Sequence, residues 1–158
     1  MRVLLWAILL LSTLAFAEED CNIVGHVSNI TVKQCNSNQD FIQITGNENS
    51  QVALENSPGV LIGINSVFVP NKSKDIWMIH RVVGAHTHVV NFFEISDHGA
   101  LVLIKNGSIG SEIGQIFHLI DASGNLVIET RDVIHNEKHR RLIHEKFILK
   151  NDRIMKIK

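Results

Sequence analysis

Short apolar runs, separated at close intervals by turn-forming residues, are the feature that most limits how this chain of 158 residues can fold. From Asp40 to Val133, seven or eight runs rich in β-branched residues alternate with clusters of Gly, Pro, Asn and Ser. The longest run, Val60 to Val69, stops at Pro70. Such spacing is typical of strands in antiparallel sheets. No segment before residue 136 keeps a helical period, so the pattern predicts an all-β fold, an antiparallel Greek-key sandwich of about seven strands.

Residues 1–17 have the composition of a signal peptide. Arg2 supplies a positive charge, an apolar run follows as far as Phe16, and Ala15 and Ala17 are small residues at the positions that a signal peptidase reads. The run is shorter than the roughly 18 apolar residues that a transmembrane helix needs, and no later stretch reaches that length. We therefore expect a secreted chain, or the extracellular part of a longer membrane protein, with no transmembrane segment in this chain.

Two cysteines, Cys21 and Cys35, lie close together near the N-terminus of the mature chain. An even number of cysteines in an oxidising compartment indicates a disulfide. Closing this short loop contributes on the order of 3 kcal/mol in the chain-entropy model. A zinc site would need more ligands than His26, the one candidate nearby. We expect a disulfide that ties residues 18–39 down outside the sandwich.

Three sequons for N-glycosylation begin at Asn29, Asn71 and Asn106. Each lies in a polar context in which the backbone is accessible, and Asn71 and Asn106 fall between predicted strands. The sequons are consistent with export, and we expect all three asparagines at the surface.

The C-terminal residues 138–158 are rich in lysine and arginine. Phe147–Leu149 and Ile154–Ile157 can pair as a hairpin, whereas residues 135–150 can instead form a frayed helix; the strands are favoured. The segment is interpreted as a solvated basic tail or as the start of a further domain, with heparin or phospholipid binding as a less favoured alternative. Since the net charge of the whole chain is −1, no nucleic-acid partner is indicated.

Four pieces of the chain, in order, resemble one cadherin repeat. Leu54 to Gly59 is similar to the Glu-Asn-x-Pro turn of the family, and Ile76 to Ile79 stands where its third strand is found. Phe92 to Leu103 resembles its Phe-x-Ile and Gly-x-Leu-x-Leu hairpin, and Ile128 to Asn136 looks like its last strand and linker. The resemblance implies a cadherin-like or immunoglobulin-like sandwich over residues 40–137.

The same resemblance implies calcium ligands, but most of them are missing. Glu55 and Asp132 match carboxylates that hold the ion in the family, whereas Ile134 and His135 replace the expected Asn and Asp of the linker. Calcium takes six to eight oxygen ligands, so two carboxylates make a weak site at most. We expect no tightly bound cofactor and folding without calcium.

No catalytic constellation is visible in the sequence. His86 and His88 would share one face of a strand, but no Cys or Glu accompanies them at zinc spacing, so surface histidines are the preferred interpretation. A nucleophile elbow and a phosphate-binding loop are both lacking. We therefore expect a chain that is not an enzyme.

The sequence favours a module for cell adhesion or protein recognition, with a partner on a cell surface or in the extracellular matrix. The alternative is a stand-alone secreted sandwich that carries a small apolar ligand or antagonises a protein.

Overall fold

The computed structural model describes residues 21–35, 40–44, 47–54, 59–136 and 139–158, and these residues are nearly all in strands. The twelve strands are β1 (Cys21–Val27), β2 (Ile30–Cys35), β3 (Asp40–Ile44), β4 (Asn47–Leu54), β5 (Gly59–Val69), β6 (Lys74–Val83), β7 (Thr87–Ile95), β8 (Leu101–Ser111), β9 (Gln115–Ile120), β10 (Leu126–Asn136), β11 (His139–Lys150) and β12 (Arg153–Ile157). A single 3₁₀ turn, Pro70–Lys72, is the one helical element of the described chain. None of the described segments is a helix long and apolar enough to cross a membrane.

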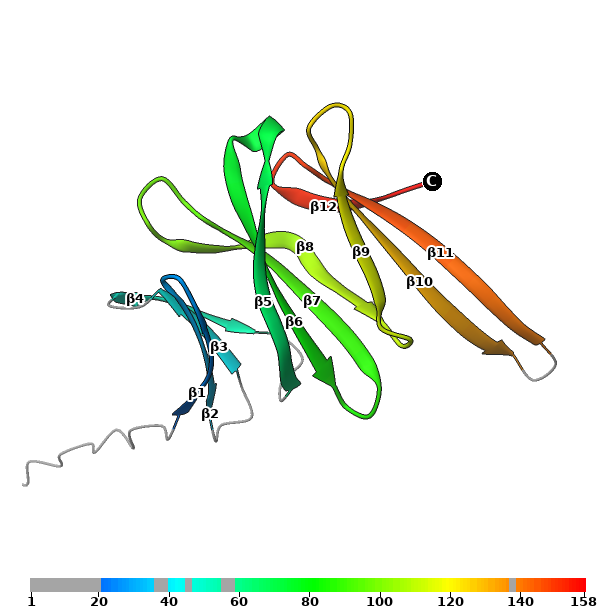
Figure 1. The fold of residues 1–158 in the computed structure, drawn as a ribbon, viewed down its shortest axis with the longest axis horizontal. Coiled ribbons are helices and arrows are strands. Elements are labelled where there is room, and N and C mark those ends of the chain that lie inside the picture. Colours follow the sequence, from blue (N-terminus) through cyan, green and yellow to red (C-terminus); the bar gives the residue numbers. More distant parts are fainter. Residues whose placement is uncertain (1–20, 36–39, 45–46, 55–58, 137–138) are drawn as a thin grey trace, which may run out of the picture.

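The strands form three successive meanders of four antiparallel strands each (Figure 1). Strands β1 to β4 make a separate sheet, and β5 to β8 and β9 to β12 are the two other meanders. Tight turns join most neighbours. In the turn between β7 and β8, Gly99 has φ +76°, and the Ser96 N–H donates to the Ala100 carbonyl over 2.8 Å. Glycine adopts this left-handed conformation without steric cost, so the turn is encoded locally.

One short parallel contact joins the second and third meanders into a sheet of eight strands. Arg153 of β12 pairs with Lys105 of β8, which gives the order β5-β6-β7-β8-β12-β11-β10-β9. The sheet curves until it is nearly barrel-like, and its two edges meet at one end. There the Asn71 N–H donates to the Gly124 carbonyl over 3.0 Å, and the Asn71 side-chain amide donates to Asn125 Oδ1 over 2.6 Å.

The meander β5–β8 is the central layer, because both of its faces are covered. One face packs on the first meander around an N-terminal core of Ile30, Val32, Ile42, Leu54, Ile79, Phe93 and Leu101. The other packs on the third meander around an inner core of Val69, Ile76, Met78, Val90, Phe92, Ile104, Ile109, Leu126, Ile128, Leu149 and Ile154. Successive strand residues point to opposite faces, so a strand covered on both sides needs consecutive apolar residues. This is why Ile76 to Ile79 lack the polar alternation of a half-exposed strand.

The architecture confirms the prediction of an all-β fold but does not confirm the Greek-key sandwich. Twelve strands are described instead of about seven, and they follow one another as meanders in a mixed sheet. A long return connection, which a Greek key requires, is not found within the described ranges. The difference comes from pairing between strands that are distant in sequence, which local turn signals do not specify.

The expected boundaries at residues 39 and 137 do not separate structural units. Strand β2 pairs with β3 through Ile30 and Ile44, so the N-terminal segment belongs to the first sheet and does not lie outside it. Strands β11 and β12 pair with β10 and β8, so the C-terminal segment belongs to the large sheet rather than to a tail or a further domain. Its apolar residues Leu149 and Ile154 are only 3% and 2% exposed, which explains why it folds inward. The favoured prediction of strands there is confirmed.

Candidate functional site

Three strands of the described chain contain no charged residue, and each of them begins a meander. They are β1, β5 and β9, with the sequences CNIVGHV, GVLIGINSVFV and QIFHLI. Each also forms one edge of its sheet. Proteins usually place charges or prolines on edge strands, because an unpaired strand edge invites another chain to pair with it. Here the charges lie on neighbouring strands, and the edges are apolar.

These edge strands also carry most of the exposed large hydrophobic residues. Eight of the twelve such residues in the described chain lie on them: Ile23, Val24 and Val27 on β1, Val60, Ile62 and Phe68 on β5, and Phe117 and Leu119 on β9. The most exposed are Val60 at 68% and Ile23 at 65%. Single exposed hydrophobics are ordinary, whereas a concentration on adjacent strands marks a site of interaction.

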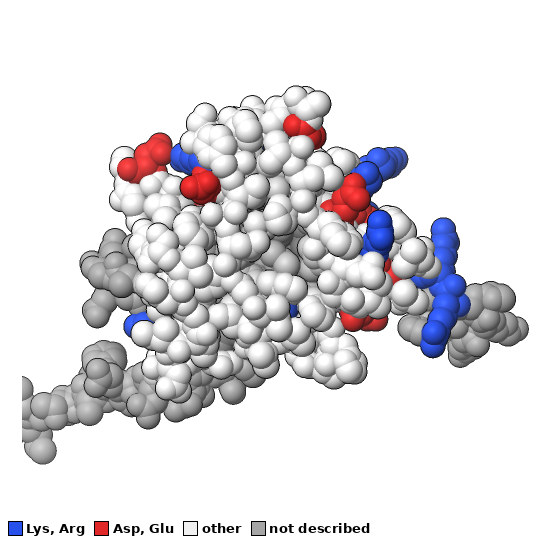
Figure 2. Space-filling view, in the orientation of Figure 1, with Lys and Arg blue, Asp and Glu red and all other residues white. Residues whose placement is uncertain are grey.

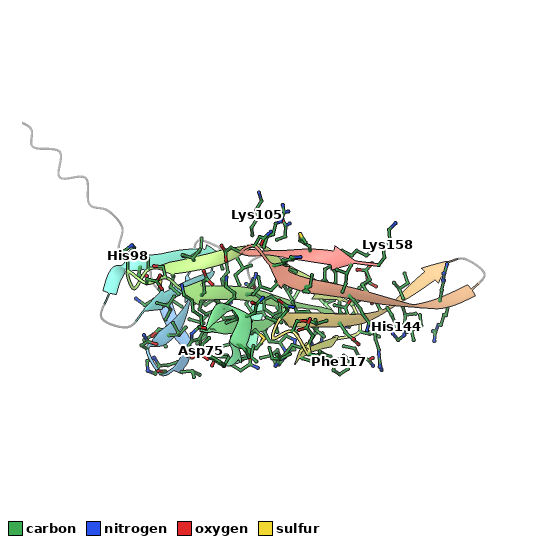
Figure 3. All side chains as sticks on the ribbon, turned by 90° about the horizontal axis from the view of Figure 1, so that it is seen from above. Asp75, His98, Lys105, Phe117, His144 and Lys158 are labelled. Atoms are coloured by element: carbon green, nitrogen blue, oxygen red, sulfur yellow. The ribbon has the colours of Figure 1, made fainter. Side chains whose placement is uncertain are left out.

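Strand β1 contacts β5, and β5 faces β9 across a small cleft; we call the three strands together the edge face. Gly25 of β1 packs so closely on Leu61 and Ile64 of β5 that a side chain at position 25 would collide with them. The Gln34 side-chain amide donates to the Gly59 carbonyl over 3.2 Å, which holds the first sheet beside the start of β5. In Figure 2 the surface over β1 and β5 is continuous and without charge, and charged side chains appear at its margins. Viewed from above, Phe117 of β9 lies on one side of the molecule and Lys105 and Lys158 lie on the opposite side (Figure 3).

At one margin of the edge face, charged pairs fix the turns. The Lys72 ammonium lies 3.0 Å from a Glu94 carboxylate oxygen and also contacts Asp152, and Lys74 lies 2.9 Å from Asp97. The two carboxylates raise the pKa of Lys72 despite its partial burial, which by itself acts in the opposite direction. These pairs join three turns of the large sheet, so they are structural contacts.

A small cleft opens in the edge face between β5 and β9. Its volume is about 150 Å³, and it is lined by Asn65, Met78, His80, Val90, Phe92, Ile116 and His118. The floor of the cleft is part of the inner core, since its lining includes Met78, Val90 and Phe92. Ligand pockets are typically about 300–1,000 Å³. The cleft is therefore too small to enclose the apolar ligand that a carrier would transport.

Two histidines in this region form a direct hydrogen bond. His80 Nε2 and His88 Nδ1 are 3.0 Å apart, and one of these nitrogens carries the shared proton. Burial lowers the pKa of His80, and the positive charge of protonated His88 would lower it further. The Gly114 backbone packs on the His88 ring and leaves no room for a side chain. Within the described residues, no three His, Cys, Asp or Glu side chains lie close enough to hold a metal ion.

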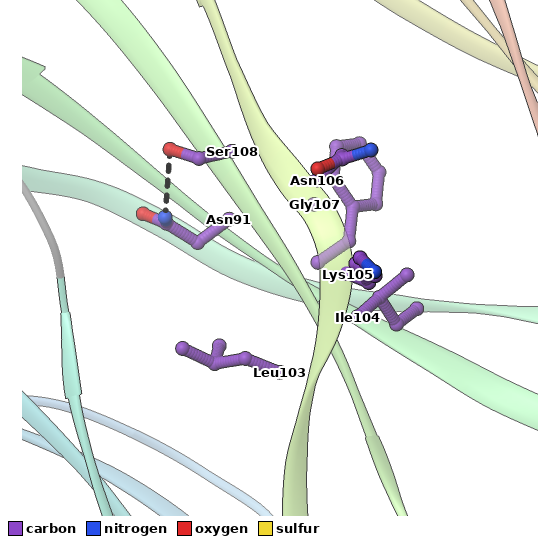
Figure 4. A pocket seen from close by; sticks show the side chains of 8 residues that line it. Asn91, Leu103, Ile104, Lys105, Asn106, Gly107 and Ser108 are labelled. Atoms are coloured by element: carbon purple, nitrogen blue, oxygen red, sulfur yellow. Dashed lines mark hydrogen bonds between the residues drawn. The ribbon is translucent and has the colours of Figure 1, made fainter. Parts of the chain in front are cut away.

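A second cavity, of about 310 Å³, lies where β8 bends away from β7 (Figure 4). The pairing of β7 and β8 shifts from Asn91–Ser108 to Phe93–Leu103, which leaves a bulge at residues 104–107. Figure 4 shows the hydrogen bond that Asn91 Nδ2 donates to Ser108 Oγ over 3.2 Å. The Asn91 side chain is 3% exposed and its Oδ1 accepts from Arg81 Nη2 over 3.1 Å, so it is a structural link.

Arg81 is completely buried in the central sheet, and the sequence analysis did not identify it. A buried guanidinium is costly unless it is hydrogen-bonded. The sequence does contain a sign of this buried charge, because a single arginine lies inside the apolar run from Ile76 to Val83. It predicts a polar network within the core, here the chain Arg81–Asn91–Ser108.

The predicted disulfide and glycosylation sites have the following positions. Cys21 and Cys35 are direct cross-strand partners in the pairing of β1 with β2. Such partners have Cβ atoms about 4.5–5.5 Å apart, close enough for a bridge after small adjustments.

Asn29, Asn71 and Asn106 are exposed; Asn106 lies in the bulge of β8 with φ +57°. The disulfide and the glycans stay predictions.

Of the two predicted calcium ligands, Asp132 is the one that lies in the described part of the chain. Glu55 lies outside the described residues. Asp132 accepts hydrogen bonds from the Glu112 N–H over 3.2 Å and from its neighbouring Val133 N–H over 3.0 Å. Both of its carboxylate oxygens are thus engaged by the backbone.

Comparison of the chain with protein-family models, with curated proteins and with solved structures finds no match. The candidate site therefore depends on the geometry alone, and the edge face is its strongest feature.

Proposed function

We propose that this chain is an extracellular recognition module that binds a protein partner, on a cell surface or in the extracellular matrix, through the edge face. The observation that carries the proposal is the concentration of exposed hydrophobic residues on three uncharged edge strands. Desolvating apolar surface stabilises a complex by roughly 25 cal/mol per Å² before the costs of association. An uncharged face avoids the additional cost of burying charges.

The extracellular compartment is part of the proposal. It is supported by the signal-like residues 1–17, by the cross-strand position of Cys21 and Cys35 and by three exposed sequons. A cadherin-like adhesion role rests on the resemblance in sequence, and the resembling segment Phe92 to Leu103 forms a hairpin. Binding does not depend on calcium in this proposal, because the ligand set is incomplete.

Binding of the labelled, secreted chain to a panel of cells and matrix proteins tests the proposal. We expect saturable binding that weakens at least tenfold when Val60 and Ile62 are both replaced by lysine, since each lysine would be desolvated in the complex. Leu142→Lys is the matched control, because Leu142 is 53% exposed on β11, outside the edge face, and Ile62 is 54% exposed. The proposal fails if no cell or matrix protein binds, or if both variants bind like the unchanged chain.

A further inference from the structure

Three cationic residues lie side by side on the outer face of the large sheet. Lys105 of β8 is the pairing partner of Arg153 of β12, and Arg153 is in turn the partner of Lys150 of β11. Paired residues on neighbouring strands project their side chains from the same face of a sheet. We call these three residues the cation row. Lys105 lies on the side of the molecule opposite Phe117 of the edge face (Figure 3).

The inner core fixes the direction in which the cation row points. Each member of the row is adjacent in sequence to a buried residue of that core, namely Ile104, Leu149 and Ile154. Because successive strand residues point to opposite faces, the three cations point outward. All three are exposed, so a ligand can reach them from solution.

None of the three cations forms an ion pair within the described part of the chain. The acidic residues nearest to the row in sequence have other partners, since Asp152 contacts Lys72 and Glu145 contacts Lys156. Like charges directly opposite each other on neighbouring strands destabilise a sheet. Three adjacent cations without a counter-charge therefore indicate a site for an external anion, which would remove the repulsion.

The cavity of about 310 Å³ at the bulge of β8 adjoins one end of the cation row (Figure 4). Lys105 lines this cavity together with the exposed residues Asn106 and Ser108. The Ser108 hydroxyl accepts the hydrogen bond from Asn91, so its own proton is available to a second acceptor. An anionic group in the cavity would therefore meet both a cation and a hydroxyl donor.

The length of the row favours a polymer with several anionic groups over a single ion. Neighbouring strands lie about 4.7–4.9 Å apart, so the row extends about 10 Å across three strands. A membrane surface is disfavoured, because proteins that lie on membranes also insert apolar side chains. None of the exposed large hydrophobic residues of the described chain lies within two residues of the row in sequence.

We propose that the cation row binds a sulfated polysaccharide of the extracellular matrix. Sulfate groups along the polymer pair with Lys105, Arg153 and Lys150, and the group beside Lys105 enters the cavity next to Ser108. The extracellular compartment is the one element that this inference takes from the proposed function. The site is separate from the edge face, so either proposal can fail without the other.

Binding of the full secreted chain to immobilised heparin tests the site. Every protein in the series carries Asn106→Gly, which removes the sequon beside the row and suits the positive φ of that position. We expect Lys150→Gln combined with Arg153→Gln to weaken binding by about tenfold or more, because charge-assisted contacts are lost. Arg140→Gln combined with Arg141→Gln is the matched control. It removes the same charge from exposed positions of β11 outside the row, and binding should change by less than about threefold.

Lys105→Gln is the sharper variant, because only the fold brings Lys105 to the other two cations. It should weaken heparin binding by about threefold or more, whereas Arg140→Gln alone should not. Circular dichroism and thermal melting establish that each variant is folded. The site is overturned if Lys105→Gln binds like the unchanged chain. It is also overturned if the control with Arg140 and Arg141 replaced loses as much binding as the row variant, since the attraction would then be diffuse.

Two further probes test the class of ligand. Heparin from which the sulfate groups have been removed should bind much more weakly, and vesicles that contain phosphatidylserine should not compete with heparin. Unchanged binding of desulfated heparin overturns the polysaccharide assignment, and so does tighter binding of the vesicles that is lost in Lys105→Gln. A complete absence of heparin binding overturns this inference alone, because the recognition of cells and matrix proteins is assigned to the edge face.

Discussion

Strands β7 and β5 belong to the same sheet and are both strongly apolar, yet they occupy opposite environments. In β7, five consecutive residues from Val89 to Phe93 are buried. In β5, Val60, Ile62 and Phe68 are more than half exposed. The difference is their position, because β7 is an inner strand covered on both faces and β5 is an edge. An apolar strand therefore identifies either a core or a surface for association, and only its place in the sheet decides between them.

Truncating one phenylalanine in each strand tests this difference in burial most directly. Phe93 is 0% exposed on β7 and Phe68 is 57% exposed on β5. We expect Phe93→Ala to lower the free energy of unfolding by about 3–5 kcal/mol, because it removes buried surface and leaves a cavity. Phe68→Ala should change it by less than about 1 kcal/mol. Urea unfolding of both variants measures the difference; similar losses would mean that β5 is buried in solution.

The edge strand β1 differs from β5 in that a covalent bond is predicted to hold it. If Cys21 and Cys35 are linked, replacing both by serine should cost about 3 kcal/mol, the value for a loop of this size. Peptide mapping without reduction should find the two cysteines joined. Free thiols at both positions in secreted protein would show that β1 is held by packing alone.

Asn91 is the polar residue inside the buried run of β7, so it tests how a polar group is tolerated there. Asn91→Ala removes an acceptor from Arg81 and a donor to Ser108, so we expect a loss of about 1–3 kcal/mol in the free energy of unfolding. Ser108→Ala is the control, since it breaks only the outer hydrogen bond and should cost less. Equal costs would show that the contact with Arg81 contributes little.

The smallest effect is expected at the histidine pair, where β6 and β7 approach the cleft. Because the pKa of folded His80 is lowered by burial and by His88, the unfolded chain binds a proton more readily than the folded chain. Stability should therefore be full above the unfolded value of about 6.5 and should fall as the pH drops below it. Thermal melting between pH 7.5 and 5 should show a smaller decrease in His80→Gln than in the unchanged chain. His86→Gln, at an exposed position, is the control, and an identical decrease in all three would contradict the assignment.

The local features of the fold were predictable from the sequence, and the long-range ones were not. The β7–β8 hairpin and the strands of the C-terminal segment follow from turn residues such as Gly99 and Asn151, whose backbones have positive φ. The parallel contact between Lys105 and Arg153 joins residues far apart in the chain, and no local pattern encodes it. The edge face was missed because the strongly apolar run from Val60 to Val69 was interpreted only as a strand. Its complete lack of charge was the available signal.

The parallel contact of β12 also constrains the order in which the molecule can be built during synthesis. Strand β12 is the last of the twelve to be made, yet it lies between β8 and β11 in the middle of the large sheet. The first meander can pair with itself as soon as residue 54 is available, whereas the large sheet stays divided until Ile157 has emerged. During that interval β8 and β11 are temporary edges, in addition to the permanent ones. The nascent chain thus passes through a period of increased risk of mispairing, when protection by a chaperone would matter most.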